Sequence, residues 1–133
     1  MDSPVIEALC RARDGEVIPT LRFNFSGVGG SEGSFDRGIE EQDDPKAAID
    51  TLKRRPRVNG MRVGVGGISF GTVVALDAVR KVKRIKALAV TSLSISALRR
   101  SKVDKFKGVK LMMVGERDRL VPTEELSSVV AGL

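Results

Sequence analysis

The stretch that most constrains this chain is VGVGGISFGTVVAL, residues 63–76, which runs from β-prone residues through Gly-Ile-Ser-Phe-Gly into a helical pattern. A side chain that projects from so sharp a strand-to-helix turn requires a strained backbone at Ser69. A Cβ at Gly67 or Gly71 is expected to crowd the neighbouring strand or helix, so the turn requires a residue without a side chain at both positions. The spacing therefore predicts a serine at the carboxyl end of a strand, where open parallel sheets place their chemistry.

Strands and helices alternate along the rest of the sequence. Strands are predicted at 20–25, 61–66, 86–91 and 109–115, and helices from Ser3 to near Gly15, over 38–55, 72–82 and 95–106, and from Thr123 onward. This alternation is typical of a parallel sheet with helices on both faces. We predict an α/β fold with about four mostly parallel strands in a single domain that spans residues 1–133.

Composition narrows the class of protein. The chain has 133 residues, a net charge of +6, one cysteine and no histidine. No apolar run approaches the ~20 residues of a membrane span, and we expect no secretory signal because residues 1–7 lack its basic and apolar regions. Cys10 is expected to be a small buried hydrophobe in a reducing cytoplasm. Eleven Lys and Arg lie between Arg80 and Lys110, but without a nucleic-acid motif they are interpreted as a solvated surface. We expect no nucleic-acid or membrane partner, no cofactor and no metal.

An acidic residue supports the interpretation of Ser69. In MMVGERDRLVP, residues 112–122, Asp118 lies just past the carboxyl end of a predicted strand. An acid at this place, after the serine in chain order, is where a Ser-Asp-His arrangement requires the residue that orients the histidine. Alone, an Asp in a loop is usually a turn residue. In combination with Ser69, the functional interpretation is favoured.

Three stretches together resemble the α/β-hydrolase superfamily, most closely small cap-less bacterial hydrolases of the dienelactone-hydrolase type. They are LRFNFSGVGGSEGSFD at 21–36, GGISFG at 66–71 and GERDRLVP at 115–122, and they occur in the family's order. The resemblance implies that Ser69 is the nucleophile, Asp118 the acid of the triad and the backbone N–H of Phe70 one oxyanion donor. It also implies a small-molecule ester or acyl substrate.

The chain departs from this family in four ways. Ser26 stands where an arginine is expected, which predicts a looser loop. The triad histidine is expected beyond Leu133. A further strand and an oxyanion-hole loop are expected before Ser3, so we predict an incomplete domain with either a rearranged sheet or low stability. Without a base, the 133 residues alone are expected to be inactive.

Two alternatives to an active hydrolase follow from the same residues. The first is a catalytically inactive hydrolase-fold module, or a gene fragment, that binds a partner at an exposed sheet edge. The second is a phosphate-binding loop formed by the glycines of 27–33. The dinucleotide fingerprint is not met there, because Glu32 occupies the place of its third glycine.

Overall fold

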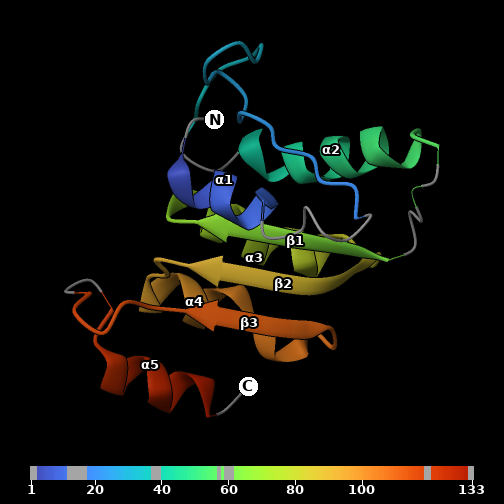
Figure 1. Cartoon of the computed structure of the whole chain (residues 1–133). Helices are drawn as coiled ribbons and strands as arrows, with labels where there is room; N and C mark the ends of the chain where they lie inside the picture. The colour runs from blue at the N-terminus through green and yellow to red at the C-terminus, as the bar shows by residue number, and fades with distance from the viewer. Residues whose placement is uncertain are drawn as a thin grey trace. The chain divides into compact units, whose positions relative to one another are not determined.

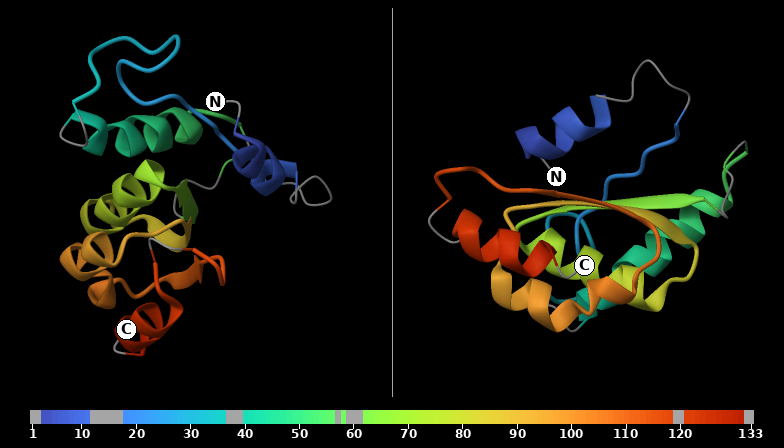
Figure 2. Two further views of the ribbon diagram at one scale, coloured as in Figure 1. Left: turned by 90° about the vertical axis from the view of Figure 1, so that its left-hand side faces the viewer. Right: turned by 90° about the horizontal axis from the view of Figure 1, so that it is seen from below.

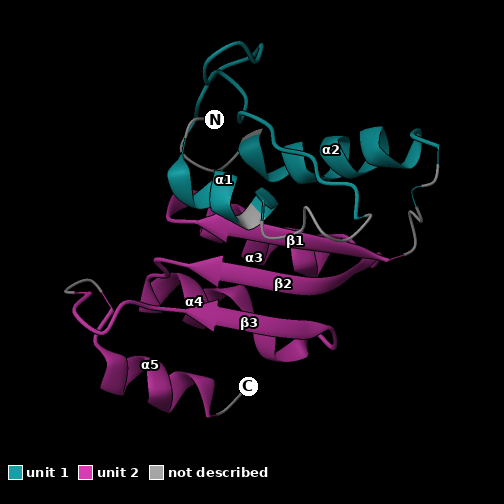
Figure 3. Cartoon of the chain, in the orientation of Figure 1, with its two compact units in different colours: residues 1–59 teal, residues 60–133 magenta. Residues whose placement is uncertain are grey.

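The computed structural model describes residues 3–11, 18–36, 40–56, 58, 62–118 and 121–131. These residues belong to two compact units, 1–59 and 60–133 (Figure 3). The first unit contains α1 (Pro4–Arg11), the short 3-10 helix η1 (Glu40–Gln42) and α2 (Asp44–Lys53). The second contains β1 (Val63–Ile68), α3 (Phe70–Lys81), β2 (Ile85–Thr91), α4 (Ile95–Ser101), η2 (Val103–Lys105), β3 (Val109–Met113) and α5 (Thr123–Val130). The expected ends of elements at Gly15, Gly38 and Met61 lie outside the described residues.

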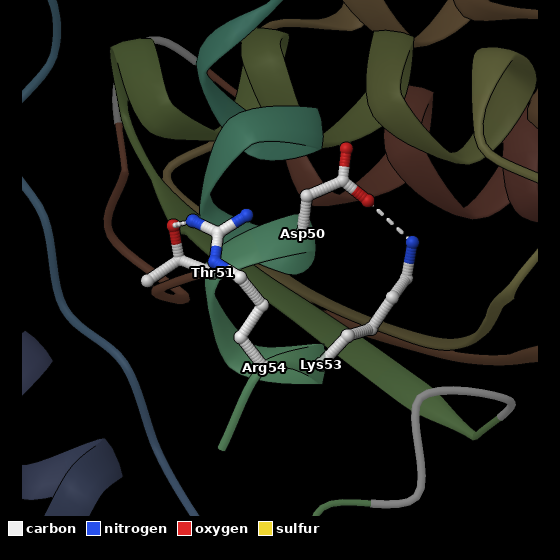
Figure 4. A network of polar contacts seen from close by, with 4 residues as sticks. All are labelled: Asp50, Thr51, Lys53 and Arg54. Atoms are coloured by element: carbon white, nitrogen blue, oxygen red, sulfur yellow. Dashed lines mark hydrogen bonds and ion pairs between the residues drawn. The ribbon is translucent and has the colours of Figure 1, made fainter.

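Helix α2 forms where the sequence predicts a helix. Pro45 occupies its first turn, where the missing N–H of proline costs nothing. Side chains three residues apart meet along this helix: Lys53 pairs with Asp50, and Arg54 Nη2 donates to Thr51 Oγ1 over 3.0 Å (Figure 4). Such pairs on a helix surface each add a few tenths of a kcal/mol.

The predicted strand at 20–25 is absent, since these residues form neither strand nor helix. The segment has β-prone residues, and the rings of Phe23 and Phe25 meet edge to face at 5.5 Å. A strand also requires a neighbouring strand that forms a ladder with its backbone N–H and C=O groups, and the sheet of the described residues, in the order β1-β2-β3, does not include this segment. The described residues therefore contain three strands, where about four were predicted.

Hydrogen bonds connect the loop that follows this segment to helix α2. The Ser26 backbone N–H donates to Asp44 Oδ2 over 2.9 Å, and its Oγ donates to Oδ1 over 2.7 Å. Gly27 has φ +69°, and a Cβ there would lie 2.3 Å from the Phe35 backbone nitrogen. The serine that was expected to loosen this loop instead anchors it to the first residue of α2.

The second unit is built on a parallel sheet in the order β1-β2-β3 (Figure 1). Gly64 pairs with Ala87 and Ala87 with Val109, so residues in register share one face. Helix α3 connects β1 to β2, and α4 with η2 connects β2 to β3. This confirms the α/β class, with parallel strands flanked by helices, and it is consistent with the partial α/β-hydrolase fold that the resemblance implies.

The core of this unit lies between the sheet and its helices. Helix α3 packs on β1 and β2, α4 packs on α3, and α5 on α4, all on one side of the sheet (Figure 2). Leu88 and Val90 of β2 are buried, as are Val74 and Leu76 of α3. A helix that is apolar on most sides is expected to be buried, which explains α3. No helix in the described part of the chain has both the length and the apolar character to cross a membrane.

Candidate active site

Ser69 forms the corner between strand and helix. β1 ends at Ile68 and α3 begins at Phe70, so a single residue makes the turn. Ser69 has φ 54° and ψ −119°, outside the regions that L-residues favour. Such a backbone costs about 1–3 kcal/mol and persists only where the surrounding structure enforces it. The strained serine that the sequence predicts is therefore present.

The hydroxyl of Ser69 does not perform the ordinary task of a serine at this place. Ser69 occupies the N-cap position of α3, where a serine Oγ normally accepts a hydrogen bond from a backbone N–H of the first turn. Ser69 makes no such side-chain bond, and the residue is exposed. Its backbone N–H donates to the Thr91 carbonyl oxygen over 3.2 Å. The backbone is thus held by β2 while the side chain does not cap the helix.

Close packing between strand and helix explains Gly67. A Cβ at this position would lie 2.2 Å from the Gly71 carbonyl oxygen and 2.8 Å from the Thr72 nitrogen. Both are backbone atoms, which cannot rotate away as the end of a side chain can. The clash predicted for a side chain at Gly67 is confirmed, and the corresponding clash at Gly71 stays a prediction.

Thr72, which sequence reasoning missed, fastens the same corner. Its side chain is fully buried, and its Oγ1 lies 3.0 Å from the Gly67 carbonyl oxygen and 2.7 Å from that of Thr91. Its backbone N–H donates to the Ser69 carbonyl oxygen over 2.9 Å. The available signal was a polar β-branched residue in the first turn of an otherwise apolar helix.

Ser69 and Asp118 line one pocket of about 270 Å³ in the second unit. Its wall consists of segments that follow the three strands: Ser69, Phe70, Val73, Ser92, Leu93, Ser94, Asp118 and Val121. Asp118 belongs to the turn after β3, where its N–H donates to the Gly115 carbonyl oxygen over 2.9 Å. The parallel topology therefore brings the predicted serine, acid and oxyanion residue to the same edge of the sheet.

The segment after β2 contributes residues that the sequence did not indicate. Ser92 has a positive φ of 51°, which turns the chain at the end of the strand. Ser94 caps α4, because its Oγ accepts the Ala97 N–H over 3.2 Å. The only available signal was their place after a predicted strand, since serine is common in ordinary turns.

The pocket edge also carries the amino end of α3. The N–H groups of a helix's first turn point out of that end, and the helix dipole favours negative charge there. Phe70 is the first residue of α3 and lines the pocket. A carbonyl oxygen that gains negative charge beside Ser69 is thus near favourable dipoles.

The pocket lacks a histidine. The pocket lining holds hydroxyls and one carboxylate, and the sequence contains no histidine. The described residues also offer no cluster of His, Cys, Asp and Glu that suits a metal ion. The arrangement can present a serine, an orienting acid and an oxyanion donor to a carbonyl compound, but it contains no general base of the usual kind.

One carboxylate of the second unit has a shifted pKa, and it serves α3 rather than the pocket. Burial alone would raise the pKa of Asp77, but hydrogen bonds and charges from Lys81 and Arg80 outweigh it, so the pKa lies below the ordinary 3.8. Lys81 Nζ lies 2.9 Å from Asp77 Oδ2, and Arg80 pairs with Oδ1. These pairs join successive turns at the carboxyl end of the helix.

Comparison with known proteins places these features in a family. The sequence model of the X-Pro dipeptidyl-peptidase family (S15) matches residues 20–105, which include the strand, corner and helix of the candidate nucleophile. An uncharacterized protein of Rickettsia prowazekii (strain Madrid E) is 28% identical over 113 residues, which are 83% of this chain and 47% of that protein. The chain thus spans about half the length of this curated relative. No solved structure gives a significant match.

Proposed function

Because the chain belongs to the S15 family of X-Pro dipeptidyl-peptidases, a serine-hydrolase family of the α/β-hydrolase superfamily, we propose that Ser69 is the nucleophile of an acyl hydrolase. The observation that carries the proposal is the backbone of Ser69, with φ 54° and ψ −119° at a pocket edge. Strain of this kind is costly, and it clusters at functional sites. A serine that merely capped the helix would need neither the strain nor its exposure.

The proposed reaction begins with attack by Ser69 Oγ on the carbonyl carbon of an ester or amide. A general base takes the hydroxyl proton as the Oγ–C bond forms, and the Phe70 N–H stabilises the oxyanion of the tetrahedral intermediate. The C–O or C–N bond then breaks, and the alcohol or amine leaves with the proton. Water then attacks the acyl carbon while the base takes its proton, and the Oγ–C bond breaks, so that the carboxylic acid leaves and Ser69 Oγ regains a proton from the base.

Asp118 is proposed to orient the general base and not to contact the substrate. In this proposal it accepts a hydrogen bond from a histidine and holds that ring toward Ser69. The histidine and the second oxyanion donor are supplied by residues outside these 133. Loss of such a histidine lowers turnover by about 10⁶-fold, and loss of one oxyanion donor by about 10²- to 10³-fold. The 133-residue chain alone is therefore proposed to be inactive.

The substrate class is part of the proposal. An ester or amide of a small acyl group suits a pocket of about 270 Å³ whose wall includes Val73, Leu93 and Val121. A specificity like that of small cap-less dienelactone hydrolases is one form of this proposal, and a cytoplasmic location fits the single cysteine.

The test compares hydrolysis of a short-chain aryl ester by the natural protein, in this proposal the longer chain that supplies the histidine, and by matched serine variants of it. Ser69→Ala should lose at least about 10³-fold in kcat, and Asp118→Asn a smaller but large factor. Ser128→Ala, at an exposed serine of α5, is the control and should retain activity within about twofold. Undiminished hydrolysis by Ser69→Ala would refute the nucleophile assignment.

A second candidate function rests on the edge of the sheet. Among the described residues, β1 pairs with β2 alone, so its other side presents backbone groups to which an extended segment can pair. With no histidine in the sequence, this favours an inactive module that binds a partner protein by strand addition. A discrete stoichiometric complex, together with no Ser69-dependent hydrolysis, would support this candidate, whereas an isolated monomer would oppose it.

A further inference from the structure

The corner that presents Ser69 is fastened by one buried hydroxyl. Thr72 Oγ1 is within hydrogen-bond distance of two carbonyl oxygens, at 3.0 Å from Gly67 on β1 and 2.7 Å from Thr91 on β2. A hydroxyl has one proton, so it donates to one of these oxygens or shares the proton between both. The first turn of α3 is thereby joined to the carboxyl ends of two strands.

The choice of threonine in a helix is otherwise unfavourable. β-Branched side chains lose rotamer freedom in a helix, and a helical threonine commonly bonds the carbonyl four residues earlier. Thr72 instead reaches the carbonyl five residues earlier and one on the neighbouring strand. Its side chain is fully buried, so an unpaired hydroxyl would be costly there. The bonds to the two strands therefore explain why a hydroxyl stands at position 72, whereas helix formation does not.

Two further bonds connect Thr72 to the strained serine. The Thr72 N–H donates to the Ser69 carbonyl oxygen over 2.9 Å, and the Ser69 N–H donates to the Thr91 carbonyl oxygen over 3.2 Å. The Thr91 carbonyl oxygen thus accepts from the Ser69 N–H and lies within hydrogen-bond distance of the Thr72 hydroxyl. The backbone on both sides of the Ser69 side chain is fixed by a network that includes Thr72.

We propose that Thr72 is a positioning residue for the nucleophile: its hydroxyl holds the end of α3 against β1 and β2, and so keeps Ser69 in its strained conformation. The inference rests on the proposed function, because it assigns Ser69 a chemical task. It adds a residue that touches neither the substrate nor the reacting atoms. Loss of the hydroxyl lets the Ser69 Oγ and the Phe70 N–H drift from their productive places, and displacement by about 1 Å can cost about 10²-fold in rate.

The experiment uses the natural protein with three variants. Thr72→Val removes the hydroxyl and keeps the shape, Thr72→Ser keeps the hydroxyl, and Val103→Ala disturbs a buried residue of η2 outside the pocket. Hydrolysis of a short-chain aryl ester gives kcat and KM, and thermal unfolding measures the loss of stability. Amide hydrogen exchange measures the protection of the Ser69 N–H.

Thr72→Val should lower kcat by about 10- to 100-fold with KM changed less than about threefold, and should speed exchange of the Ser69 amide at least tenfold. Thr72→Ser should restore most of both values. Val103→Ala should lower the unfolding temperature without either effect. If Thr72→Val does not fold, Thr72→Cys replaces it. Because a thiol is a weaker hydrogen-bond donor, its kcat and its protection of the Ser69 amide should be lower than those of Thr72→Ser.

Two results would overturn the inference: equal effects of Thr72→Val and Val103→Ala on kcat and exchange, or a Thr72→Ser variant as impaired as Thr72→Val. The failure of the proposed function is recognised separately. If Ser69→Ala hydrolyses the ester as well as the natural protein, Ser69 is not the nucleophile. The exchange of the Ser69 amide then still decides whether Thr72 holds the corner.

Discussion

Substitution of Gly67 by alanine gives the sharpest test of how tightly strand and helix meet. The new Cβ would lie 2.2 Å from the Gly71 carbonyl oxygen, 2.5 Å from its carbon and 2.8 Å from the Thr72 nitrogen. Relief requires α3 to move away from β1 by several tenths of an ångström or more. Overpacking of a well-packed core costs about 1–3 kcal/mol, and clashes with backbone belong at the upper end. We expect the free energy of unfolding to fall by about 3 kcal/mol.

A matched control lies one residue earlier on the same strand. A Cβ at Gly66 would lie 3.6 Å from the Ala89 carbonyl oxygen, an ordinary contact. Gly66→Ala should be neutral or stabilise by up to about 1 kcal/mol, because alanine restricts the unfolded chain. The two variants thus isolate the clash from the general effect of replacing a glycine.

Urea unfolding followed by circular dichroism measures the difference. With a slope of about 1.5 kcal/mol per M, a loss of about 3 kcal/mol lowers the midpoint of Gly67→Ala by about 2 M. The midpoint of Gly66→Ala should equal or exceed that of the natural protein. Coincident midpoints for the two variants would refute the close approach of α3 to β1.

Three further predictions concern single side chains of the second unit. Ser69→Gly should raise the unfolding temperature by about 3 °C while hydrolysis is lost, because glycine adopts a positive φ without strain; an unchanged temperature would contradict the strain. Asp77→Asn should be less stable than the natural protein at pH 6, and the difference should be smaller at pH 2: a carboxylate whose pKa is lowered on folding stabilises above its unfolded pKa of about 3.8, and that contribution decreases as the pH falls toward and through the folded value. Thermal unfolding at both pH values measures the difference in stability between the two proteins. A difference that does not change with pH would contradict the prediction. Ser94→Ala removes the cap of α4 and should cost about 1 kcal/mol in urea unfolding, whereas Ser96→Ala on the same helix should cost less than half as much.

Local signals were sufficient at the corner. Gly67 and Ser69 are two residues apart, and the steric constraints that relate them lie within one turn of the chain. The strand before Ser69 ends two residues later than predicted, at Ile68, because Gly67 and Ile68 still pair with Val90 and Thr91 of β2. Pairing across the sheet extends a strand where the composition alone suggests that it stops.

Signals that depend on distant partners were weaker. The segment 20–25 has the composition of a strand, yet a strand exists only where another backbone pairs with it. Ser26 was interpreted as a weakness because its partner, Asp44, lies 18 residues away along the chain. Asp118 was expected just past the carboxyl end of a strand, and it lines the pocket with Ser69 because parallel strands bring their carboxyl ends to one edge of the sheet. Whether these residues perform catalysis stays a prediction until the variants are measured.

The order of the sheet also determines where the molecule tolerates change. The pocket wall comes from the segments that follow the strands, while the connections Val82–Arg84 and 102–108 lie at the opposite ends of β2 and β3, about 17 Å away along a strand of five residues. Gly108 is closed to substitution, since a Cβ there would lie 2.4 Å from the Lys86 carbonyl oxygen, but Lys83 and Arg84 are exposed. Sequence added beside Lys83 lengthens a surface turn and leaves the register of the strands intact. Affinity tags and reporter domains thus have a place in this fold that is remote from the pocket at Ser69.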